Sequence, residues 1–170
     1  MLLYLGYTHP DIALAVHQCA RYTFEPKQLH DVALKCIGRY PKGTSEKGLI
    51  MCTNDNFNVD YYPDVDFAGL WGHENPQDPH CVRSRTGYVI TFAGCPVLWV
   101  STLQKEMTLS TMESEHIALS TSCKDLFPIL DLVQEMGQCF GLPINDTCNM
   151  HIQIHEDNVG ALTLGNLEPR

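Results

Sequence analysis

The chain has 170 residues, of which 44% are apolar and 18% are charged, a composition that excludes wholesale disorder and suits one domain with an appended piece. No apolar run approaches the roughly 20 residues that a membrane-spanning helix needs, and the N-terminus lacks the basic region of a secretory signal. The 8 cysteines are widely spaced without a C-x-x-C pair. We therefore expect reduced thiols in a protein that is neither secreted nor embedded in a membrane.

The net charge of −9 is unevenly distributed along the chain. Residues 1–50 hold 6 Lys and Arg against 4 Asp and Glu, whereas residues 51–170 hold 5 against 16. A carboxylate-rich part joined to a mildly basic part fits metal-dependent chemistry on a polyanion. It fits an acidic, solvated surface equally well, and from charge alone the solvated surface is the stronger interpretation.

Residues 1–50 show helical patterns. Pro10 and Asp11 are typical of a helix start, and apolar residues then recur at helical spacing. A second helix is predicted to begin at residues 25–26 and to end at residues 41–44. Two short helices cannot bury a sizeable core alone, so we expect them to pack on the rest of the chain or on an N-terminal neighbour.

Residues 51–170 are predicted to form three strands, a long helix, a fourth strand and the start of another helix. The strands are expected at residues 59–67, 86–93, 97–101 and 150–154. Pro63 indicates an edge or bulged position in the first strand, and a turn at residues 94–96 predicts an antiparallel meander. A capping box at residues 110–113 starts the long helix, which Pro128 is expected to kink. The last helix is expected to begin at Asn158.

One carboxylate of the long helix lies beside its apolar stripe. The residues that fall within about 60° of one direction on a helical projection are Leu119, Cys123, Leu126, Leu130 and Val133. Glu115 falls at the edge of this arc, whereas Glu113 lies outside it and is interpreted as a cap. A carboxylate on an apolar stripe is costly unless it is paired or binds a metal. The alternative for Glu115 is an acid near solvent that the helix dipole stabilises.

Three further acids lie on or after strands. Asp64 and Asp66 share one face of the first predicted strand, and Asp157 follows the fourth. Alone, each has an ordinary structural explanation, namely a solvated strand face or a turn residue before a helix. Together with Glu115 they form a more informative set, because acids at such positions can converge at one end of a sheet. Oxygen atoms are the ligands that Mg²⁺ requires.

A zinc site is the less favoured alternative. Cys148, His151 and His155 have a spacing that suggests zinc ligands, but the two histidines bracket a predicted strand and no second cysteine pair exists.

A set of ordered motifs together resembles the C-terminal part of the Pol polyprotein of copia-type LTR retrotransposons. The motifs that resemble the tail of its reverse transcriptase lie at residues 4–16, 20–22, 35–44 and 48–49. The motifs that resemble its ribonuclease H domain lie at residues 62–69, 84–90, 98–101, 109–119 and 156–158. The resemblance implies a connection-like helical segment over residues 1–50 and a ribonuclease H-like domain over residues 51–170. The implied fold is α/β, with a mixed sheet of three antiparallel strands, a helix and a parallel fourth strand.

The resemblance also implies a function and a site. The implied reaction is endonucleolytic hydrolysis of RNA in RNA–DNA hybrids during reverse transcription. Two Mg²⁺ ions, with Mn²⁺ as an alternative, would be held by Asp64, Glu115 and Asp157. Weaker candidates for phosphate contacts are Arg83, Arg85 and Lys105. The implied partners are the hybrid and the rest of the Pol polyprotein, including reverse transcriptase, in cytoplasmic virus-like particles or in the nucleus.

One departure from the family pattern affects the expected activity. Family members complete the metal site with a fourth acid, close to or beyond the last core strand and helix. This chain ends at Arg170, before those elements, so we expect an incomplete ribonuclease H domain that cleaves poorly or not at all by itself. The alternative is a non-catalytic truncated remnant that at most binds nucleic acid or another Pol chain.

Overall fold

The computed structural model describes residues 2–54, 56–142 and 150–166. It divides into two compact units, Met1–Ile50 and Met51–Arg170. Among the described residues, no helix is both long and apolar enough to cross a membrane. The seven cysteines in the described ranges are free thiols.

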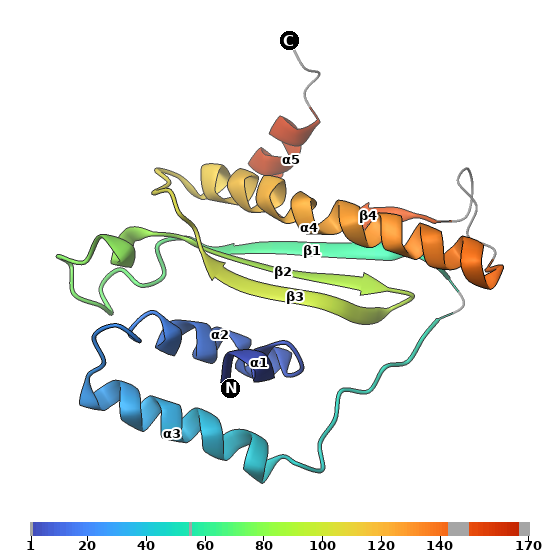
Figure 1. The fold of residues 1–170 in the computed structure, drawn as a ribbon. Coiled ribbons are helices and arrows are strands. Elements are labelled where there is room, and N and C mark those ends of the chain that lie inside the picture. The colour runs from blue at the N-terminus through green and yellow to red at the C-terminus, as the bar shows by residue number, and fades with distance from the viewer. Residues whose placement is uncertain (1, 55, 143–149, 167–170) are drawn as a thin grey trace. The chain divides into compact units, whose positions relative to one another are not determined.

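The first unit consists of three helices: α1 (Leu2–Gly6), α2 (Pro10–Ala20) and α3 (Gln28–Gly43) (Figure 1). Helix α2 begins at the predicted proline, whereas α1 has no counterpart among the predicted elements. The core of this unit is small. It is formed by Ile12, Val16 and Ile37, with Leu2, Leu5 and Cys19 packed against them.

The second unit is built on one four-stranded sheet. Its strands are β1 (Val59–Asp66), β2 (Arg85–Phe92), β3 (Cys95–Leu103) and β4 (Ile152–Ile154). Their order is β3-β2-β1-β4 (Figure 1). Strand β1 is antiparallel to β2, β2 is antiparallel to β3, and β4 is parallel to β1. The predicted fold class is thereby confirmed: an α/β domain with a ribonuclease H-like mixed sheet.

Local chemistry explains how the antiparallel part of the sheet is connected. Strands β2 and β3 are joined by Ala93 and Gly94, both of which have positive φ (50° and 80°). Two such residues make the tight hairpin whose twist matches that of the strands. Pro63 lies within β1 opposite Tyr88, but β4 pairs only with residues 59–61. Beyond Tyr61, β1 therefore has no partner on the β4 side, which makes the missing N–H of Pro63 tolerable there.

Helix α4 (Thr111–Phe140) packs on the sheet, and α5 (Val159–Gly165) packs on α4 (Figure 1). A short 3₁₀ helix, η1 (Pro79–Val82), precedes β2. The core between α4 and the sheet contains Val59, Tyr61, Tyr88, Ile90 and Leu126. Pro128 lies inside α4, which continues through it.

Candidate metal centre

Glu115 lies in the second turn of α4, at the end of the helix that is tied to the sheet. The helix begins at the predicted cap, because Ser110 Oγ accepts from Glu113 N at 3.1 Å. The return bond of the predicted capping box is shifted by one residue, because Glu113 Oε2 accepts from Leu109 N at 2.8 Å. Gln104 Nε2 donates to the carbonyl of Ser114 at 3.0 Å and to Thr86 Oγ1 at 3.0 Å. The backbone that carries Glu115 is therefore fixed to strand β2 by a buried side chain.

The segment after β4 brings two further acids to the same place. The last sheet-like hydrogen bond runs from His155 N to Tyr61 O at 2.8 Å, and Glu156 and Asp157 come next in the chain. Asn158 Oδ1 then accepts from Gly160 N at 2.9 Å and from Ala161 N at 3.1 Å. This arrangement caps the first turn of α5. The backbone is therefore held by hydrogen bonds on both sides of the two acids.

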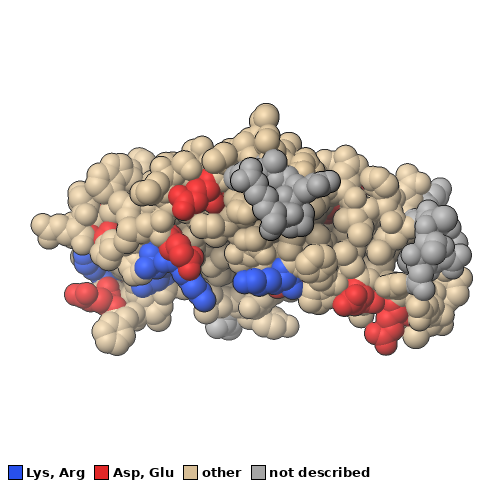
Figure 2. Space-filling view, turned by 90° about the horizontal axis from the view of Figure 1, so that it is seen from above, with Lys and Arg blue, Asp and Glu red and all other residues tan. Residues whose placement is uncertain are grey.

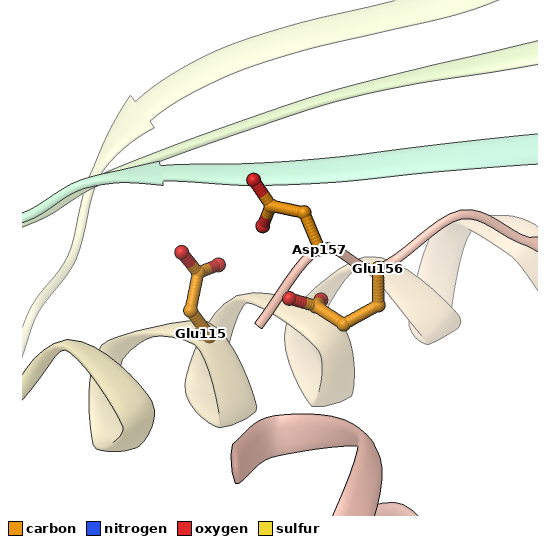
Figure 3. A group of neighbouring side chains, drawn as sticks. All are labelled: Glu115, Glu156 and Asp157. Carbon is orange, nitrogen blue, oxygen red and sulfur yellow. The ribbon is translucent and has the colours of Figure 1, made fainter. Parts of the chain in front are cut away.

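The carboxylates of Glu115, Glu156 and Asp157 converge. They offer ligand oxygens that all lie within 4.8 Å of one another. Figure 3 shows Glu115 reaching from α4 toward the two acids of the segment after β4. Glu115 and Glu156 are 7% and 8% exposed, and the Oε2 atom of each is buried without a hydrogen-bond partner among the described residues. Buried oxygens without donors are costly unless a cation satisfies them, so the donor set fits a hard divalent metal ion.

The electrostatics of the cluster result from burial and like charge. Burial raises the pKa of Glu115 to about 7, and the charges of Glu156, Asp64 and Asp157 add to the effect. Burial also raises the pKa of Glu156, and the charges of Asp157 and Asp64 raise it further. The hydrogen bond from Asn158 N acts in the opposite direction and lowers this pKa. No described Lys or Arg forms an ion pair with these carboxylates. The cluster therefore carries unbalanced negative charge, which a bound cation would stabilise.

Of the three predicted acids, Glu115 and Asp157 lie together in the cluster. Asp64 is exposed near the end of β1, and its Oδ1 accepts from the N–H of Val65 at 2.9 Å. It is not one of the three residues within 4.8 Å, but its charge acts on both glutamates of the cluster. The metal-binding role of each predicted acid remains a prediction.

The carboxylate of Asp66 lies against the turn after β1 and is not one of the three that converge. A Cβ atom added to Gly69 would lie 2.0 Å from Asp66 Oδ2, so this carboxylate folds back against the turn. Asp66 does not contribute to the raised pKa of Glu115. Of the two aspartates on β1, Asp64 is the one whose charge acts on the cluster.

Glu156 is the site residue that sequence reasoning missed. It stands next to Asp157 in the motif at residues 156–158, which is the signal that pointed to this segment. The family resemblance assigned the third acid to Asp157 alone, so Glu156 was not expected at the site.

The three basic candidates differ in their surroundings. Arg85 is 7% exposed and its Nη1 donates to Ser101 Oγ at 3.4 Å, whereas Arg83 is half-buried and Lys105 is exposed. In Figure 2, basic and acidic groups of the described residues are interspersed on the face in view rather than gathered into one basic patch. A contact of these residues with phosphate remains a prediction, and the burial of Arg85 makes it the least accessible of the three.

The alternative zinc ligands are only partly described. Cys148 lies outside the described residues. The ring of His155 stacks on Tyr62 with centroids 4.3 Å apart, and its Nε2 lies 3.0 Å from Asp60 Oδ1. His155 is therefore already engaged by two partners on β1.

Fold and cluster together define an α/β domain of ribonuclease H-like architecture with a candidate divalent-metal centre. No family model and no solved structure matches the chain. Curated relatives do match: the retrovirus-related Pol polyproteins from transposons RE2 and RE1 of Arabidopsis thaliana are each 30% identical over 96% of this chain and 10% of their own length. That from transposon TNT 1-94 of Nicotiana tabacum is 37% identical over 76% of this chain and 9% of its own.

The chain thus spans about a tenth of the length of the curated relatives that it matches. The similarity to retrovirus-related Pol polyproteins of transposons supports a Pol polyprotein fragment. The resemblance predicted from the sequence motifs is confirmed at this level.

Proposed function

We propose that residues 51–170 are the ribonuclease H domain of a copia-type Pol polyprotein, and that they hydrolyse the RNA strand of RNA–DNA hybrids with the help of divalent metal ions. The observation that carries the proposal is the convergence of Glu115 and Asp157 beside the end of β1, within a ribonuclease H-like sheet. Two buried carboxylate oxygens at this place have no donor. The homology to transposon Pol polyproteins supports the same assignment.

In this proposal, Asp64, Glu115 and Asp157 hold Mg²⁺, or Mn²⁺ in its place. Bound divalent ions supply water activation and stabilisation of the leaving oxygen in phosphodiester hydrolysis. The chain itself holds the carboxylates in place. Gln104 and the capped start of α4 fix the backbone of Glu115, and burial excludes water from one side of its carboxylate. Asp157 is exposed, which leaves the other side open to an approaching nucleic acid.

Substrate choice in this proposal comes from the shape of the hybrid. Contacts to 2′-hydroxyls and to the minor groove distinguish RNA–DNA hybrids without base readout. Lys105 is exposed and is the more accessible candidate for a phosphate contact. The rest of the Pol polyprotein, in cytoplasmic virus-like particles or in the nucleus, would be the partner that supplies reverse transcriptase.

The test is cleavage of an end-labelled RNA–DNA hybrid by an excess of the purified chain. We expect weak cleavage that needs Mg²⁺ or Mn²⁺, stops with EDTA and falls as salt screens the phosphate contacts. Single-stranded RNA and a DNA duplex of the same sequence should stay intact. Asp64→Asn should abolish cleavage, and Glu135→Gln, which changes an exposed acid elsewhere on α4, should not. Cleavage that survives Asp64→Asn, or none at all in either metal, would contradict the proposal.

A second candidate function is a non-catalytic binding role within a Pol assembly. It is favoured by an apolar groove of about 470 Å³ between the C-terminal half of α4 and the hairpin end of the sheet, lined by Phe92, Leu98, Ile129, Leu132 and Met136 among others. Leu132 and Met136 are 54% and 43% exposed, and exposed apolar patches of this kind mark interaction sites. If this candidate holds, the chain binds a Pol partner without cleaving any hybrid.

A further inference from the structure

We propose that Glu156 is a metal ligand and gives the site a fourth carboxylate, beside Asp64, Glu115 and Asp157. The proposal rests on the proposed function in one respect, namely that the acidic cluster is the metal centre. It adds a ligand that the family resemblance does not assign to any residue of this chain.

The path of the chain after β4 allows two neighbouring residues to face the same site. Strand β4 ends at Ile154, and beyond that point the backbone need not keep the alternation that sends neighbours to opposite faces. Glu156 and Asp157 accordingly both lie within 4.8 Å of Glu115, measured between ligand oxygens. Figure 3 shows the Glu156 side chain turning toward Glu115.

The two oxygens of Glu156 have different surroundings. Oε1 accepts from Asn158 N at 3.1 Å, whereas Oε2 is buried and has no partner. A glutamate that only capped this turn would leave Oε2 desolvated without compensation, which is costly. A ligand would use the same hydrogen bond to orient its carboxylate, as residues behind a metal ligand commonly do. Asn158 is itself fixed by the first turn of α5.

The charge of the site points the same way. Two divalent cations carry four positive charges, and four ionised carboxylates balance them. No described Lys or Arg competes for the oxygens of Glu156. Oxygen ligands of this kind and number suit Mg²⁺ and Mn²⁺.

The experiment is a titration of the full chain with Mn²⁺, in which the free ion is measured by electron paramagnetic resonance. Glu156→Gln keeps an oxygen for the bond from Asn158 N and removes the charge, so we expect it to weaken Mn²⁺ affinity by at least roughly tenfold. Glu135→Gln makes the same chemical change in an exposed acid of α4 that lies about 30 Å along the helix from Glu115. This control should leave the Mn²⁺ affinity unchanged. Should Glu156→Gln fail to fold by circular dichroism, Glu156→Asp replaces it, because shortening the side chain withdraws Oε2 without changing the charge.

The outcomes separate this inference from the proposed function. If Glu115→Gln weakens Mn²⁺ binding and the Glu156 variant does not, or if the wild-type chain binds no Mn²⁺, the inference is wrong. Hybrid cleavage that depends on Asp64 but does not change in the Glu156 variant would support the proposed function and contradict the role of Glu156 as a ligand. Mn²⁺ binding that depends on Glu156 in a chain that cleaves no hybrid would support the inference and count against the nuclease.

Discussion

Replacing Glu115 by Gln should remove a pH-dependent loss of stability from the metal-free chain. The pKa of this carboxyl rises from an ordinary 4.5 to about 7 in the folded chain. Below about pH 4.5 the group is neutral in both states and costs nothing. Between pH 4.5 and 7 the unfolded chain releases this proton first, so the free energy of unfolding falls as the pH rises. The gap between the two pKa values corresponds to a loss of at most about 3 kcal/mol above pH 7.

The assay is urea unfolding in EDTA, followed by tryptophan fluorescence between pH 4.5 and 7.5. Both tryptophans of the chain, Trp71 and Trp99, lie in the unit Met51–Arg170, so the signal reports on the unit that contains the site. The free energy of unfolding of Glu115→Gln, minus that of the wild type, should grow by about 1–3 kcal/mol over this pH range. Glu135→Gln is the matched control and should show no such trend. A difference between Glu115→Gln and wild type that stays constant with pH would refute the argument from burial and like charge.

Two further predictions concern the supports of the site. Gln104→Leu should lower the free energy of unfolding by about 1–3 kcal/mol, because it removes two buried hydrogen bonds, one to the carbonyl of Ser114 and one to Thr86 Oγ1; a urea midpoint equal to that of the wild type would contradict this. Asp66→Asn should retain the hybrid cleavage that Asp64→Asn abolishes, because the Asp66 carboxylate lies against the turn at Gly69 and not at the cluster. Equal loss of cleavage in the two variants, at equal melting temperature, would reverse the assignment of the strand acid.

The sheet was predictable where local pattern determines it. Alternating residues and a turn signal between the second and third predicted strands indicated the antiparallel meander, and the capping residues indicated the start of α4. The turn occupies residues 93–94 instead of the predicted 94–96, because Ala93 adopts a positive φ of 50° and alanine carries no turn signal. Helix α1 has five residues and η1 has four, too few for either to show a hydrophobic period.

The site was predictable only in part, because burial of a polar residue depends on partners far away in the chain. A helical projection placed Glu115 beside the apolar stripe, and its side chain is indeed buried. The burial of Glu156 depends instead on how the chain leaves β4, and the burial of Arg85 depends on β3 and its Ser101. Neither the path of the chain after β4 nor the contact between Arg85 and Ser101 can be identified from the residues immediately around these positions.

Two acids of the site, Glu156 and Asp157, follow the strand that the sheet holds most weakly. Strand β4 has three residues, all exposed, and pairs with β1 at three positions. Glu156 and Asp157 come shortly after it, whereas Glu115 belongs to a thirty-residue helix that packs on the centre of the sheet. A cation shared by these carboxylates would join the short strand to the long helix, in addition to replacing like-charge repulsion by attraction. Because an ion that binds the folded chain in preference to the unfolded one stabilises it, metal binding and the docking of β4 should reinforce each other.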